Sequence, residues 1–165
     1  MSYQEKRTIF TVVSGIIILV AYGLYAYGKV QSGNIDVEDL KFWANTMLLF
    51  IGIGIVVTII GQIVFHILIA ISIAVKEKVY NNDTSDEQIE KTINSEMVTD
   101  EMDKLIELKS MRFGFIFSGI GFVAGLILLA LNYSPVIMLN ILYVSFSVGS
   151  LLEGFAQIFY YRKGI

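Results

Sequence analysis

One acidic residue, Glu153, lies within an apolar stretch, where a charge is costly. An ionised side chain at the centre of a membrane-spanning helix costs roughly 2.5–3.5 kcal/mol on insertion scales, so such residues face protein and often mark paths for protons or ions. Gln157 follows Glu153 by four residues and therefore shares its helix face. The pattern predicts either a proton or cation site near the inner membrane surface, or a neutral acid that holds two helices together.

Two rows of small and polar residues surround this position in the sequence. At intervals of four, one row reads Ser145, Gly149, Glu153, Gln157 and the other Gly54, Thr58, Gln62, His66. Such faces let membrane helices approach closely and form hydrogen bonds. We expect an intramembrane polar cluster in which Gln62 and Thr58 lie opposite Glu153, and its five members are Glu153, Gln157, Gln62, Thr58 and His66. We also expect five small residues to serve helix packing: Gly54, Gly149, Ser145, Gly121 and Gly125.

The remaining chemistry in the sequence is sparse. The chain has one histidine, His66, and no cysteine, whereas a zinc site needs three or four ligands. Counting from Lys76 places His66 level with Glu153, but an internal repeat matches it to Tyr161 at the membrane edge, and we favour a hydrogen-bonded histidine at that edge. Phosphate-binding loops, Gly-rich dinucleotide motifs and protease or hydrolase motifs are absent. We therefore expect neither an enzyme nor a cofactor.

These residues belong to four apolar stretches, approximately residues 9–27, 43–75, 113–131 and 136–161. About 20 apolar residues span a bilayer core as a helix. A hydrophobic fraction of 55% excludes an ordinary soluble domain. The sequence predicts an all-α fold, a four-helix bundle in which residues 1–165 form a single membrane domain. In outline it resembles the small four-helix membrane proteins of prokaryotes, a resemblance that implies no particular function.

Basic residues predict how the chain crosses the membrane. Ten of the twelve lysines and arginines precede the first stretch, follow the fourth, or lie in the segment 76–112. Because basic residues collect on the cytoplasmic side, we expect both termini and this segment in the cytoplasm of a prokaryotic cell.

The segment 76–112 is expected to form a helical hairpin, with Ser85 capping its first helix and Thr99 capping a second that continues into the third apolar stretch. We favour a solvated hairpin over a docking surface for a partner. The second apolar stretch, continued as one helix, would be roughly 50 Å long against a membrane core of roughly 30 Å. It must tilt, break, or project residues 67–75 beyond the membrane, where they need cover.

Matching residues indicate an internal repeat of two parallel hairpins, with chance similarity as the alternative. Ser14-Gly15-Ile16 matches Ser118-Gly119-Ile120. Further along, three more matches follow one common offset: Asn45 with Asn140, Gly54 with Gly149, and Gln62-Ile63 with Gln157-Ile158.

Our first functional hypothesis is a non-enzymatic membrane protein that acts by helix packing, as a dimer or as the accessory subunit of a membrane complex. The alternative is a small oligomeric transporter or channel that uses Glu153 as its proton or cation site, and a ligand-binding sensor ranks third. The expected partners are the lipid bilayer and either a second copy or another membrane protein. No feature predicts nucleic-acid binding.

Overall fold

The computed structural model of the chain describes residues 2–33, 38–80 and 86–164. Within them the fold is all-α, and its five helices are α1 (Tyr3–Gln31), α2 (Leu40–Tyr80), α3 (Asp86–Met97), α4 (Glu101–Ala130) and α5 (Pro135–Lys163). All except α3 are long and apolar enough to cross a membrane. These four helices fit a multi-pass membrane protein.

Local sequence accounts for the helix ends. The Ser2 hydroxyl accepts the backbone N–H of Glu5 at 3.1 Å and caps α1. Asp100, not the predicted Thr99, caps α4, because Asp100 and Asp103 each accept the other's backbone N–H through their carboxylates. As predicted, α4 continues without a break into the third apolar stretch. The predicted cap Ser85 lies outside the described residues.

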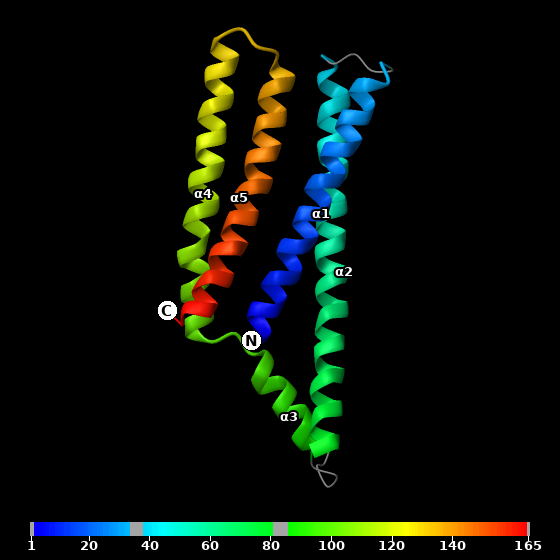
Figure 1. Cartoon of the computed structure of the whole chain (residues 1–165), viewed down its shortest axis with the longest axis vertical. Helices are drawn as coiled ribbons and strands as arrows, with labels where there is room; N and C mark the ends of the chain where they lie inside the picture. The colour runs from blue at the N-terminus through cyan, green and yellow to red at the C-terminus, as the bar shows by residue number, and fades with distance from the viewer. Residues whose placement is uncertain (1, 34–37, 81–85, 165) are drawn as a thin grey trace.

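The second helix does not break. Its 41 residues are continuous, which corresponds to about 60 Å, twice the membrane core. Figure 1 shows α2 passing beyond the start of α1, with α3 returning along its far end. We call this end of the molecule, where α1 begins and α5 ends, the α3 end. The opposite end, which holds the connection between α4 and α5, we call the turn end.

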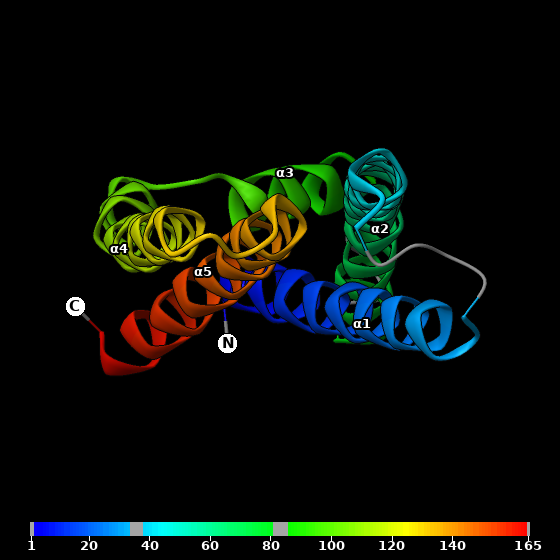
Figure 2. The same ribbon diagram turned by 90° about the horizontal axis from the view of Figure 1, so that it is seen from above.

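The helices form an open arrangement. The closest packing is between α4 and α5, and α1, α2 and α5 contact one another in pairs. No comparable packing joins α4 to α1 or α2 in the described part of the chain. Viewed from above, α4 therefore stands at one edge, beside α5 (Figure 2). This packing does not confirm the predicted four-helix bundle. Among the described residues, α4 and α2 lack packing comparable to that between α1 and α5, so the packing does not confirm the predicted repeat.

A buried aromatic cluster holds α1, α2 and α5 together at the turn end. Its buried members are Tyr22, Trp43, Met47, Phe50 and Val136. The Tyr22 ring lies edge-on to Phe50, with centroids 5.4 Å apart, and its hydroxyl donates to Asn140 Oδ1 at 2.7 Å. Because the ring is covered and its hydroxyl is paired, Tyr22 fixes α1 against α5 at this end.

Candidate functional site

A cavity of about 840 Å³ lies between α1, α2 and α5, below the aromatic cluster, and reaches the first turns of α4. Its lining changes character along its length. At the turn end the walls are mostly apolar, with Ile18, Leu19, Met47, Phe50, Ile51, Leu139, Leu142 and Phe146 beside Tyr143 and Ser147. At the α3 end they are polar, with Gln4, Arg7, Thr8, Thr11, Thr58, Gln62, Asp103, Glu107, Glu153, Gln157 and Tyr161. The cavity is thus amphipathic.

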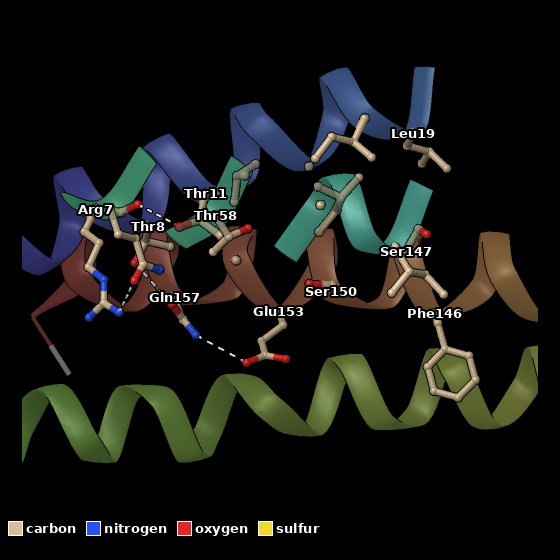
Figure 3. Close-up of a pocket in the computed structure, with 18 of the residues that line it drawn as sticks. Arg7, Thr8, Thr11, Leu19, Thr58, Phe146, Ser147, Ser150, Glu153 and Gln157 are labelled. Atoms are coloured by element: carbon tan, nitrogen blue, oxygen red, sulfur yellow. Dashed lines mark hydrogen bonds between the residues drawn. The ribbon is translucent and has the colours of Figure 1, made fainter. Parts of the chain in front are cut away.

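Two separate sets of hydrogen bonds cross the polar half of the cavity. On α1, Thr8 donates to the side-chain oxygen of Gln157 at 3.1 Å, and the amide nitrogen of Gln157 donates to a Glu153 oxygen at 3.4 Å. Arg7 donates to the side-chain oxygen of Gln62, on α2, at 3.3 Å (Figure 3). Polar side chains therefore connect α1 to both α2 and α5 at one level of the cavity.

The Glu153 carboxylate points toward α4 rather than toward α2 (Figure 3). Its second oxygen lies beside Gly114, where an added Cβ would be only 2.9 Å away. No lysine, arginine or histidine forms an ion pair with Glu153 among the described residues. Glu107 lines the same cavity and carries a second negative charge. The carboxylate thus has an amide donor but no cation, at the wall of a large cavity.

The predicted partners of Glu153 are distributed differently from our expectation. Gln157 does bond to it, whereas Gln62 bonds to Arg7 and Thr58 lines the cavity on the α2 side. His66 lies apart from the cavity lining, with its Nδ1 3.3 Å from the Tyr3 hydroxyl at the start of α1. Four of the five residues expected to form one polar cluster thus share the cavity, and His66 does not.

Four of the five residues expected to serve packing lie between α4 and α5. A Cβ on Gly121 would overlap the Ser145 side chain, and one on Gly149 would be 2.8 Å from Ser118 Oγ. A Cβ on Gly125 would approach Met138 to 3.1 Å. Gly54 differs, because a Cβ there would meet only Ile18 at 3.8 Å, and it lines the cavity instead.

Two polar contacts lie where the cavity reaches the α3 end. The Tyr161 hydroxyl donates to Asp103 at 2.9 Å, which ties α5 to α4, and Gln4 donates to Thr99 at 3.1 Å, which ties α1 to the segment before α4. Among the described residues, no three histidine or acidic side chains lie close enough to hold a metal ion.

Sequence reasoning used Arg7 only to orient the chain and did not place Thr8, Asp103 or Tyr161 at a site. A signal was available for α1, because Gln4, Thr8 and Thr11 recur at helical spacing and mark one polar face. Asp103 and Tyr161 gave no such signal, since their pairing depends on how α4 and α5 cross.

No family model matches the chain, and no curated protein and no solved structure shows significant similarity to it.

Proposed function

We propose that this chain is a non-enzymatic, multi-pass protein of the cell membrane that binds a small solute in the cavity and moves it across the bilayer, with Glu153 as the proton or cation site. The observation that carries the proposal is a carboxylate that lacks a cationic partner among the described residues and lies at the wall of a cavity of about 840 Å³. From the sequence alone, helix packing is the first hypothesis and transport the alternative. The cavity instead supports transport as the first hypothesis.

The free-energy cost of placing the Glu153 carboxylate within a spanning segment is the physical reason for this proposal. A carboxyl group within a spanning segment is expensive, and a packing role alone is served equally well by a neutral amide such as Gln157. Glu107, at the same cavity, adds a second negative charge instead of relieving the first. Both charges are relieved when a proton or a cation enters, which is the basis of binding and release in such a site.

The last part of the proposal is the orientation of the chain across the membrane. The start of α1, the end of α5 and the whole of α3 lie at one end (Figure 1), and this end carries ten of the twelve basic residues. The positive-inside rule supports a cytoplasmic location for it. The polar half of the cavity then faces the cytoplasm, and the aromatic cluster lies toward the outer surface.

Ion flux into liposomes tests transport. Purified protein is reconstituted in liposomes containing a pH-sensitive dye, and the decay of an imposed pH gradient is followed with sodium, potassium or neither ion present. We expect protein-dependent decay that is lost in Glu153→Gln and kept in Glu101→Gln, an exposed acid outside the cavity. A complete lack of protein-dependent movement of protons, sodium and potassium contradicts transport.

A second candidate, a dimer or an accessory subunit, is favoured by α2. Where α2 continues past α1, several large apolar side chains are exposed: Ile67, Leu68, Ile71, Val75 and Val79. Packing against another chain would cover part of them. Disulfide cross-linking between copies carrying Ile71→Cys tests self-association without interference, because the native chain has no cysteine. Strictly monomeric protein in mild detergent contradicts the dimer.

A further inference from the structure

We propose that the cavity takes an amphiphilic organic cation, with its charged group beside Glu153 and its apolar body in the half lined by Phe50 and Leu139. The inference rests on the proposed binding role of the cavity and names the class of molecule that it accepts. It is carried by three properties of the lining: its net charge, the spacing of its acids, and the separation of its polar and apolar halves.

The charge of the lining selects a cation. Three carboxylates, those of Asp103, Glu107 and Glu153, face one guanidinium, that of Arg7. Arg7 donates to Gln62, and Asp103 already accepts hydrogen bonds from Tyr161 and from the Asp100 backbone. An anion would meet this net negative field, whereas a cation beside Glu153 would supply the partner that the described residues do not provide.

The spacing of the acids favours an organic ion over a metal ion. Calcium or magnesium needs several oxygen ligands at about 2.0–2.6 Å from one centre. No group of three acidic or histidine side chains in the described ranges has that closeness. A volume of about 840 Å³ is instead that of a site for a molecule of drug size, since such sites measure roughly 300–1,000 Å³.

The apolar half selects an amphiphile. Beyond Ser150 the walls are built mostly from aliphatic and aromatic side chains, Phe50 and Phe146 among them, and Ser147 is a small polar exception. A small hydrophilic cation would leave this half unfilled, whereas an apolar body gains free energy in proportion to the area that it buries. Aromatic faces add attraction for a delocalised positive charge.

Binding of tetraphenylphosphonium to the purified protein in detergent, measured by isothermal titration calorimetry, tests the inference. We expect saturable binding of this cation and none of tetraphenylborate, an anion of nearly the same size and shape. Glu153→Gln should weaken the binding by about tenfold or more, because the buried charge loses its partner. The matched control Glu101→Gln, an exposed acid outside the cavity, should bind as the native protein does.

A second pair of variants tests the apolar half without changing any charge. Gly54→Leu places a side chain in the cavity where an added Cβ meets only ordinary contact, and should weaken binding by about tenfold by filling space. Gly52→Leu adds the same side chain to the same helix at a position outside the cavity lining, where an added Cβ meets nothing within 4 Å. This variant should leave binding unchanged. Gel filtration and circular dichroism establish that each variant is folded.

The outcomes separate this inference from the transport proposal. Equal binding of both probe ions, or binding unaffected by Glu153→Gln and Gly54→Leu, would indicate partition into detergent or bound lipid and overturns the inference. If Glu153→Gln does not fold, the probe ions and the glycine pair still decide. Proton or ion movement without tetraphenylphosphonium binding retains transport and rejects the substrate class. Selective binding of tetraphenylphosphonium without any ion movement retains the substrate class and rejects transport.

Discussion

The carboxylate of Glu5, near the start of α1, accepts a hydrogen bond from Nε of Arg162, near the end of α5, at 3.2 Å. The Glu5 side chain is only 7% exposed, whereas that of Arg162 is 67% exposed. The pair joins the first and last helices at the α3 end. At the turn end, Tyr22 and Asn140 join the same two helices. The cavity wall between α1 and α5 is thus fixed at both ends.

Arg162→Ala should lower the stability of the folded protein by about 1–3 kcal/mol, because it leaves the nearly covered Glu5 carboxylate without its cation. Thermal unfolding in detergent, followed by circular dichroism, measures the change. The additional substitution Glu5→Gln should restore part of the loss, since it removes the stranded charge. Lys6→Ala, which removes an exposed base beside Glu5, is the control, and an equal loss there would contradict the assignment.

Tyr22→Phe should lower stability by about 0.6–1.5 kcal/mol, the range measured for single hydrogen bonds in soluble and membrane proteins. The substitution keeps the ring against Phe50 and removes only the hydroxyl that donates to Asn140. Tyr25→Phe is the matched control, because that tyrosine also contacts Phe50 but is partly exposed. The same thermal assay applies, and a Tyr22 variant as stable as the native protein would refute the role of this bond.

The sequence predicts the helices of this protein better than it predicts their packing. Four apolar stretches identify the four long helices, because their length and composition are local properties. Spacing also identifies Gly121 on one helix, and Ser145 and Gly149 on another, as small residues of packing faces, and the structure places them between α4 and α5. The surface against which such a face packs is not determined by the local sequence. Gly54 belongs to the same kind of row, yet it faces the cavity.

The site was predictable from the sequence only in part. Glu153 and Gln157 share a face because they are one turn apart, and their hydrogen bond follows from that spacing. The direction of Glu153 toward α4 depends on the rotation of α5 about its own axis, which a repeat of 3.6 residues does not determine. Arg7 was missed because a basic residue at a helix start has an adequate explanation in membrane topology.

Single cysteines should report which side of the membrane each end occupies. We expect Tyr133→Cys, in the turn between α4 and α5, to react with an impermeant maleimide in right-side-out vesicles. Val98→Cys, between α3 and α4, should react only in inverted vesicles, because the α3 end carries the basic residues. Both positions are exposed, and the native chain contributes no background label. The reverse pattern would invert the proposed direction of transport.

Ser110→Ala should either leave the free energy of unfolding unchanged or raise it by about 1–3 kcal/mol. Ser110 is fully buried on α4, and its hydroxyl has no hydrogen-bond partner in the part of the chain that the structure describes. Replacing an unpaired buried hydroxyl by hydrogen removes its desolvation cost and leaves almost no cavity. Ser147→Ala is the comparison, because the Ser147 hydroxyl donates to the Tyr143 carbonyl oxygen at 2.8 Å and its loss brings no such gain. Clear destabilisation by Ser110→Ala would show that this hydroxyl has a partner in the membrane.

Gly121→Ala and Gly119→Ala form the sharpest pair, because they make the same change two residues apart on α4. A methyl group on Gly121 would overlap the Ser145 side chain, so α4 and α5 would have to separate, at a cost of about 1–3 kcal/mol. On Gly119 the methyl group meets no atom within 4 Å, and alanine favours the helix by about 1 kcal/mol relative to glycine. We therefore expect thermal unfolding to move in opposite directions for the two variants. Equal shifts would mean that α4 and α5 do not meet at Gly121, and the wall that carries Glu153 would then need a different helix behind it.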